Sequence, residues 1–292
     1  MKKVIVFLAV CSKLNAQKIQ LTGKILNKEN KEIVAYANIS FLDSSNGVSS
    51  NKEGRFFLEI EKKLMNKKVH ISCLNFKDTI VFERDLQNKI LFLKPENYVL
   101  NEIVISKKRN EKIILDKVKR RVIPMYSGGS VKMIAKYFPN YHQLGYYFQN
   151  IKIHFSRRGF KKSKFRIRIF SVDSINGKPK RDLLLKSIPI SIKKKQKEIV
   201  INLENSMLEV PKNGFFVAFE KLFIPENEFF YEKGRLKKSQ KSYSPVIGLT
   251  KTKELSLEDC KIFLFNKGKW WLSPKMDKND KWVPAISVTL SN

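Results

Sequence analysis

The chain has 292 residues, of which 42% are hydrophobic, and a formal net charge of +31 at pH 7. It contains no internal repeat of 20–50 residues and no low-complexity tract, which excludes repeat architectures. Its basic residues are 47 lysines and 11 arginines, spread from end to end. Because arginine reads phosphates and guanine edges better than lysine, this bias argues against nucleic acid as a partner and leaves anionic surfaces and acidic glycans open.

Residues 1–16 have the order of a secretory signal peptide. Lys2 and Lys3 precede the apolar run 4–10, and small residues follow up to Ala16; an apolar run this short cannot span a bilayer. We expect cleavage after Ala16, export to the periplasm or the outer membrane, and no transmembrane span in the mature chain. Acylation of Cys11 as a lipoprotein is an alternative, although the residue before it is not small.

Residues 17–95 are predicted to form a first unit of short antiparallel strands. Apolar residues alternate with polar ones, as at Phe56, Leu58 and Ile60, and turn clusters recur about every ten residues, the pattern of a β-sandwich. Both phases of the last strand are apolar, so we expect it to lie centrally. We also expect Cys73 to be a buried free thiol and His70 to face outward. The expected strands are residues 19–26, 37–42, 55–60, 68–74, 79–82 and 89–93.

Residues 96–144 are expected to connect this unit to a second one. Residues 99–105 are predicted to be extended. Ile114, Val118 and Val122 recur at every fourth position, which predicts one short amphipathic helix over residues 111–122. An apolar stripe this narrow more often docks on its own domain than on a membrane surface.

Residues 145–292 are predicted to form a second β-sandwich, jelly-roll-like in size. Apolar residues alternate with Lys164, Arg166 and Arg168 along one strand, which predicts a half-buried strand with a basic outer face. Residues 224–246 lack periodicity and are expected to leave the sheet. The expected strands are residues 146–155, 164–172, 187–192, 198–203, 215–219, 261–265, 270–272 and 285–290.

Several blocks of the first unit carry a family resemblance. They are Gly23-Lys24-Ile25, Ala35-Tyr36-Ala37-Asn38-Ile39, Ser49-Ser50-Asn51-Lys52-Glu53-Gly54-Arg55-Phe56 and Ile71-Ser72-Cys73-Leu74. With these blocks, residues 19–93 resemble the carboxypeptidase-D regulatory-like domain, a transthyretin-like sandwich of exported proteins of Gram-negative bacteria. The block after Leu74 departs from the family, with Asn75-Phe76 where Gly-Tyr is usual. The ~190 residues that follow are too few for a transporter barrel, so the resemblance implies a free-standing exported accessory protein.

The sequence shows no catalytic constellation, no phosphate-binding glycine loop and no metal-ligand spacing. His70, His142 and His154 lack neighbouring ligands and are expected to be structural residues at the surface. Residues 277–280 offer oxygen ligands for calcium, but they lack the turn glycine and the bidentate Glu, so a polar turn is expected. The same holds for Asp173. We therefore expect no catalytic residue, no cofactor and no metal.

Trp270, Trp271 and Trp282 lie close together in the sequence. Their faces suit the stacking of sugar rings, whereas the flanking strands favour packing in a core. The leading hypothesis is a non-enzymatic, exported accessory protein of the cell envelope that acts through contacts with an envelope protein or an anionic surface. The alternative is a glycan-binding module that uses these tryptophans and surface lysines. An enzyme with an Asp/Glu site in residues 145–292 is disfavoured, because carboxylates are scarce relative to lysine.

Overall fold

The computed structural model describes residues 18–96, 111–118, 122–125, 132–141, 145–157, 159, 161–184, 187, 189–233, 238–274, 279 and 281–292. Regular structure in these ranges is β-strand, apart from the short 3-10 helices η1 (Lys62–Leu64), η2 (Glu83–Asp85), η3 (Glu204–Ser206) and η4 (Pro225–Asn227). The predicted all-β fold is confirmed. The expected signal peptide, the extended piece 99–105 and His142 lie outside the described residues. Among the residues described, no helix has both the length and the apolar character needed to cross a membrane.

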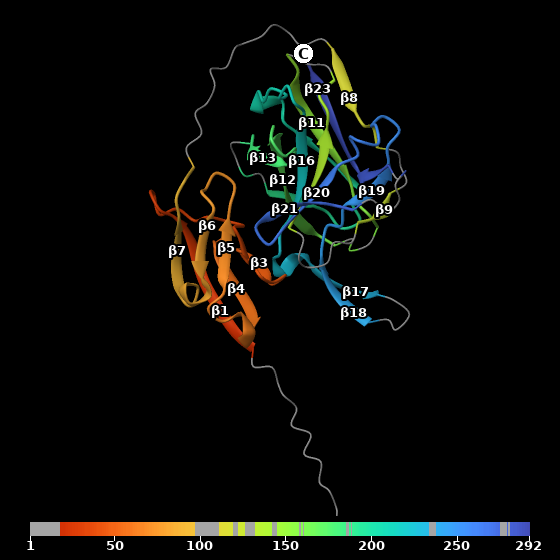
Figure 1. The fold of residues 1–292 in the computed structure, drawn as a ribbon. Coiled ribbons are helices and arrows are strands. Elements are labelled where there is room, and N and C mark those ends of the chain that lie inside the picture. The colour runs from red at the N-terminus through yellow and green to blue at the C-terminus, as the bar shows by residue number, and fades with distance from the viewer. Residues whose placement is uncertain are drawn as a thin grey trace, which may run out of the picture.

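The N-terminal strands form two facing sheets (Figure 1). The first has the order β4-β1-β7, in which β1 (Lys18–Asn27) is antiparallel to β4 (Arg55–Glu61) and parallel to β7 (Lys89–Leu93). The second has the order β3-β2-β5-β6, built from β2 (Asn38–Phe41), β3 (Gly47–Ser49), β5 (Lys68–Ser72) and β6 (Thr79–Phe82). Alternate residues of both sheets point inward and share one hydrophobic cluster, as the two-residue period of a strand requires.

The strand predicted to lie centrally in the first unit is in fact an edge strand. β7 pairs only with β1 among the described residues. Ile90 and Phe92 are half exposed, whereas Leu93 is buried. The unbroken apolar run 90–93 therefore did not indicate burial on both faces, and the prediction was wrong.

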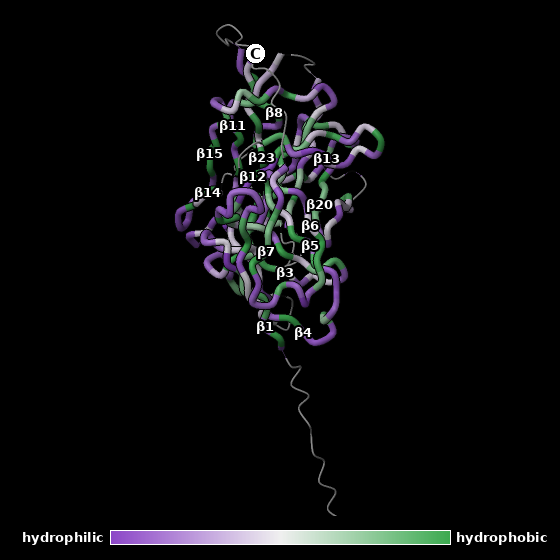
Figure 2. Tube along the Cα trace, turned by 90° about the vertical axis from the view of Figure 1, so that its left-hand side faces the viewer, coloured by the Kyte–Doolittle hydropathy of each residue, from purple (hydrophilic) through white to green (hydrophobic). Residues whose placement is uncertain are grey.

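The C-terminal part contains a large sheet of the order β13-β12-β16-β10-β20-β21, with β14 paired beside β12. A second sheet, of the order β15-β11-β23-β8, faces it, and their inward side chains form the largest hydrophobic cluster. Figure 2 shows this arrangement as hydrophobic strands surrounded by hydrophilic turns. The strands of the large sheet are β10 (Met133–Phe138), β12 (Ser163–Val172), β13 (Pro179–Asp182), β14 (Pro189–Ile192), β16 (Phe215–Lys221), β20 (Ile262–Asn266) and β21 (Lys269–Leu272). Those of the second sheet are β8 (Lys112–Leu115), β11 (Tyr147–His154), β15 (Glu198–Asn202) and β23 (Ile286–Ser291).

Two smaller sheets complete the C-terminal part. One has the order β22-β19-β9, formed by β9 (Ile123–Pro124), β19 (Gly248–Lys251) and β22 (Trp282–Pro284). The other is the hairpin of β17 (Glu228–Lys233) and β18 (Lys238–Tyr243), which projects from the rest of this part in Figure 1. The stretch 224–246, which lacked periodicity in the sequence, therefore leaves the main sheets as expected, but as a regular hairpin.

The helix predicted over residues 111–122 is wrong wherever the structure describes this segment. Lys112–Leu115 is the strand β8, which pairs with β23 through Thr289 and Leu290. Asp116 then has a left-handed φ of 46°, which interrupts any regular helix. β10 also falls within the predicted connector, yet it lies between β16 and β20 in the large sheet. Pairing with distant strands thus overrides a local helical period.

The two halves of the chain share packed residues and hydrogen bonds. Leu74 leaves the N-terminal sandwich and is buried within the main cluster of the C-terminal part. Tyr36 packs on Leu222 and Ile224. The backbone N–H of Ser49 donates to the carbonyl of Phe223 at 3.0 Å. These contacts fix the two halves to each other and position the groove described below.

Candidate binding surfaces

The two histidines that the structure describes, His70 and His154, form no metal site. His70 was predicted to face outward, but it is buried, and its Nε2 lies 2.9 Å from a carboxylate oxygen of Asp78. His154 lies 3.3 Å from Glu198, and its burial lowers its pKa despite that carboxylate. In the described part of the chain, no three His, Cys, Asp or Glu side chains gather as metal ligands.

The prediction that residues 164–172 have a basic outer face is wrong, because the N-terminal sandwich covers that face. Arg166 is fully buried and donates two hydrogen bonds to the carboxylate of Glu220, at 2.8 and 2.9 Å. Arg168 pairs with Asp182, and Asn38 of the N-terminal sandwich donates to Glu220. Burial alone would raise the pKa of Glu220, but the two arginines hold it below its ordinary value. We infer that this network is a structural joint between the halves.

Lysines are also buried near this joint. Lys132 is 3% exposed, and its Nζ forms no hydrogen bond with any described group. Burial lowers its pKa to about 7, although the negative charges of Glu220 and Asp78 act to raise it. Burial likewise lowers the pKa of Lys221 to about 8. A neutral lysine avoids the large cost of burying a charge, so these groups are expected to be largely uncharged in the folded protein above those values.

The three tryptophans do not line one surface. Trp270 is half-buried and packs edge-on against Phe170 and Phe265, with ring centroids 5.4 and 5.1 Å away. Trp271 follows it on β21, and because side chains alternate along a strand it points to the other face, where it is 58% exposed. Trp282 lies in β22, in a different sheet, and lines a separate cavity with His154.

Trp270 and Trp271 do line one shallow pocket of about 340 Å³. The remaining walls are formed by Asp173 and Asn176 of the β12–β13 turn and by nearby lysines, among them Lys180. The backbone N–H of Ile175 donates to Asp173 at 2.9 Å and, with Lys180 nearby, lowers the pKa of that carboxyl. The pocket therefore combines an exposed ring with a carboxylate and ammonium groups. Of residues 277–280, which were expected to form a polar turn, only residue 279 is described.

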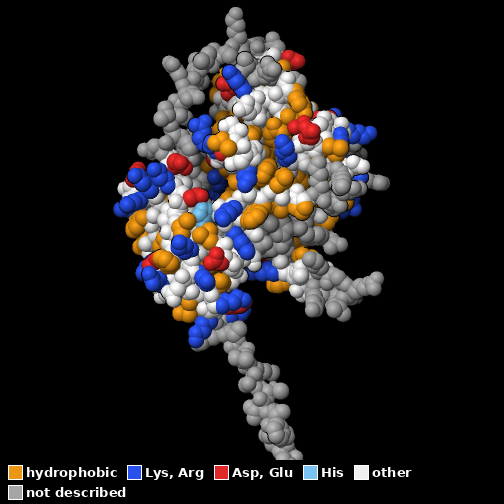
Figure 3. Space-filling view, in the orientation of Figure 1, with side chains coloured by type: hydrophobic (Ala, Val, Ile, Leu, Met, Phe, Trp, Pro, Cys, Tyr) orange, Lys and Arg blue, Asp and Glu red, His pale blue; other side chains and the backbone are white. Residues whose placement is uncertain are grey.

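Basic side chains are scattered across the molecule in Figure 3, with acidic and apolar side chains between them. Charge by itself therefore does not mark a single surface on that face. A more defined feature is a groove of about 790 Å³ that opens between the N-terminal sandwich and the β17–β18 hairpin, called here the β4 groove. Its main side chains are Val48, Phe56 and Phe57 on one side and Phe223, Glu228, Lys241 and Tyr243 on the other.

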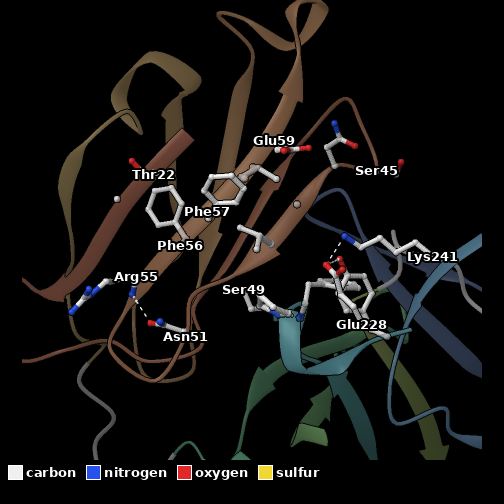
Figure 4. Close-up of a pocket in the computed structure, with 18 residues that line it drawn as sticks. Thr22, Ser45, Ser49, Asn51, Arg55, Phe56, Phe57, Glu59, Glu228 and Lys241 are labelled. Atoms are coloured by element: carbon white, nitrogen blue, oxygen red, sulfur yellow. Dashed lines mark hydrogen bonds and ion pairs between the residues drawn. The ribbon is translucent and has the colours of Figure 1, made fainter. Parts of the chain in front are cut away.

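The β4 groove has aromatic side chains of β4 on one wall and the charged side chains of Glu228 and Lys241 on the other (Figure 4). Phe56 packs over Gly23 of β1, where a Cβ atom would come within 2.7 Å of the ring. Phe57 is 51% exposed. On the facing wall Lys241 forms an ion pair with Glu228, and Tyr243 packs edge-on against Phe223. The sequence held one signal of this surface, since two consecutive phenylalanines on a strand must point to opposite faces.

Residues 21–105 match the family model of the CarboxypepD_reg-like domain, which supports the resemblance seen in the sequence blocks. This regulatory-like domain is non-catalytic, and it is compatible with a non-enzymatic binding module. No curated protein matches the chain.

Two solved structures are similar at low identity. One contains the cysteine protease and lectin-like domains of Cwp84, a surface layer associated protein of Clostridium difficile; it is 11% identical, with a TM-score of 0.37, and the match covers 64% of this chain and 37% of that one. The other is clostridial cysteine protease Cwp84 after propeptide cleavage, 12% identical, with a TM-score of 0.35 and coverage of 84% and 50%. The chain thus spans half or less of each of these two proteins.

Proposed function

We propose that this protein is a non-enzymatic accessory protein of the cell envelope, exported through its signal peptide, which acts by binding another protein in the β4 groove. The observation that carries the proposal is the groove itself. It lies where two fixed halves of the chain meet, and it exposes an aromatic side chain, Phe57, beside a paired charge on the opposite wall. Aromatic side chains in concave surfaces are typical anchors of protein interfaces.

The proposal is tested by site-specific cross-linking in living cells. A photoreactive phenylalanine analogue replaces Phe57, and a matched control places it at Ile175, which is 90% exposed on the distant β12–β13 turn. We expect one protein to cross-link at Phe57 and not at Ile175, and the purified partner to bind the wild-type chain. Identical adducts at both positions, or none at Phe57, contradict the proposal.

Export has its own test. Fractionation of the cells should recover the chain in the envelope, and N-terminal sequencing should begin at Gln17. An intact N-terminus in the cytosolic fraction contradicts this part of the proposal. An acylated N-terminal Cys11 would instead establish the lipoprotein alternative.

A second candidate function is the binding of acidic glycans at Trp271. The observation in its favour is the exposed ring, which shares a pocket with Asp173 and Lys180. Oligogalacturonate is a suitable acidic probe for calorimetry, and Trp271→Ala should abolish its binding without unfolding the protein. Unchanged binding by the variant, or no heat of binding in the wild type, excludes this candidate.

A further inference from the structure

The hydrogen-bonding pattern of β4 decides which of its backbone groups face the β4 groove. Residues of an antiparallel pair alternate between bonding to the partner strand and pointing away from it. The N–H of Ile25 donates to the carbonyl of Gly54 at 2.9 Å, which sets that alternation. The N–H of Arg55 accordingly turns away from β1 and bonds to Asn51. Phe57 must point the same way, because it is two residues further along the strand.

Phe57 and Glu59 therefore present their N–H and C=O groups on the free edge of β4. In the described part of the chain, β4 pairs with β1 alone, and no other hydrogen bond engages the backbone of these two residues. Unpaired strand edges are templates for an added strand. The groove thus contains donors and acceptors at the spacing of a β-ladder, in addition to its aromatic side chains.

The opposite edge of the same opening already binds an extended segment. Ser49, the last residue of β3, donates its N–H to the carbonyl of Phe223, and the N–H of Phe223 donates to the Ser49 Oγ at 2.9 Å. Ile224 continues this segment with extended angles, φ −110° and ψ 153°. The groove continues from this contact to β4, so an added strand would extend an interface that the fold already uses.

Side chains on the free face of β4 specify the chemistry of such a strand. Arg55, Phe57 and Glu59 share that face at two-residue spacing. The Arg55 guanidinium has no partner among the described residues, and Glu59 pairs only with the exposed Lys18, at 3.1 Å. Opposite charges directly across a ladder are favourable, and like charges are not. An antiparallel strand should therefore carry a basic, an apolar and an acidic residue at every second position, read from its N-terminus.

We propose that the β4 groove binds an extended segment of a partner protein, which adds to β4 as an antiparallel strand with the pattern basic-x-apolar-x-acidic. This inference rests on the proposed function and names the kind of partner. The facing wall of Glu228, Lys241 and Tyr243 favours a single strand over a second copy of the whole chain. A second copy is nevertheless a defined alternative, because Arg55, Phe57 and Glu59 have this pattern themselves.

The test uses the full chain and the synthetic peptide Ac-Ser-Lys-Thr-Val-Thr-Glu-Ser-NH₂, with a control peptide in which Lys and Glu are exchanged. Amide NMR shifts and hydrogen exchange report where the peptide binds. We expect the first peptide to shift and protect the amides of Phe57 and Glu59, and to bind more tightly than the control. No perturbation of these amides at millimolar peptide overturns the proposal, as does equal binding of the two peptides.

Two variants separate main-chain pairing from contacts of the ring. Phe57→Pro removes the outward N–H, which an edge strand tolerates, whereas Phe57→Thr keeps it and removes only the ring. We expect the proline variant to lose about tenfold more affinity than the threonine variant, the equivalent of one hydrogen bond. Equal losses in two folded variants contradict strand addition.

A third variant does not depend on the proline substitution. Arg55→Glu should reverse the preference at one position and favour a peptide with Lys in place of its Glu; an unchanged preference contradicts the proposed register. Sedimentation of the wild type alone tests whether a second copy of the chain occupies the groove instead. Self-association that Arg55→Glu abolishes would show that the occupant is a second copy and would overturn the partner segment. If a partner cross-links at Phe57 while the peptide fails, the proposed function stands and only strand addition is overturned.

Discussion

Replacing Glu220 by glutamine tests whether the buried charge network joins the two halves of the protein. Glu220 and Arg166 are both fully buried, and two hydrogen bonds connect them. Asn38 of the N-terminal sandwich donates to the same carboxylate. Glutamine has nearly the shape of glutamate, but it leaves Arg166 as a buried cation without its counter-charge.

The expected loss of unfolding free energy depends on how many buried charges lose their counter-charge. Removing one partner of a buried ion pair costs about 3–5 kcal/mol. Arg168 keeps Asp182, and glutamine still accepts a hydrogen bond from Arg166, so only one charge is stranded and we expect about 3 kcal/mol. Since domains are stable by about 5–15 kcal/mol, this loss is a large share of the total.

Urea unfolding at pH 7, followed by circular dichroism, measures the loss. Glu226→Gln, on an exposed part of η4, is the matched control and should change the free energy of unfolding by less than about 0.5 kcal/mol. If Glu220→Gln loses less than about 1 kcal/mol, the network is not the joint inferred here.

The difference in unfolding free energy between the wild type and Glu220→Gln should depend on pH. The pKa of Glu220 is lower in the folded protein than its ordinary value of 4.5, so the unfolded chain takes up the proton first as the pH falls. The stabilisation by Glu220 is therefore complete above the ordinary value and is lost as the pH falls through the folded pKa. The difference between wild type and Glu220→Gln should shrink in that acidic window and stay constant near neutrality.

Four further substitutions have distinct expected outcomes. Leu74→Ala should lower the free energy of unfolding by about 2–5 kcal/mol in urea titrations, because it empties a site in the C-terminal core; a loss below about 1 kcal/mol contradicts that packing. Lys132 has its pKa lowered to about 7, so the unfolded chain binds more protons above that pH, and stability should rise from pH 7 to 9 by up to about 1.4 kcal/mol per unit. Lys132→Met should flatten this rise, and an equal slope in both proteins refutes the assignment. Trp270→Ala should cost about 2–3 kcal/mol by calorimetry, whereas Trp271→Ala should cost less than about 0.5; equal losses contradict their opposite placement.

The sequence alone determined the β class and most strand positions, because these depend on local alternation. The run from Arg55 to Glu61 shows it directly, with buried Phe56, Leu58 and Ile60 between exposed neighbours. Local turn chemistry was equally readable, since Gly54 adopts a φ of 73° where a side chain would be strained. The burial of Cys73 as a free thiol is confirmed for the same reason, as it continues an apolar phase.

The candidate site was harder to predict from the sequence. The consecutive residues Phe56 and Phe57 on one strand indicated that one of the two rings must face outward. Neither the spacing nor the composition indicated the facing wall, because Lys241 and Tyr243 lie far along the chain in a stretch without periodicity. The three tryptophans are also close together in the sequence. The fold separates Trp282 from the other two, because β22 and β21 belong to different sheets.

Only the tertiary structure decided which polar faces are covered. The alternation at Arg166 shows that one face of β12 is polar, but not that a second sandwich packs on it. A single clue was present, because Glu220 is a lone acid at the end of an apolar strand and needs a buried cation. For β8 and β10 no such clue existed. Their state depends on hydrogen bonds with β23, β16 and β20, and a strand acquires its pairing energy from partners that its own residues do not specify.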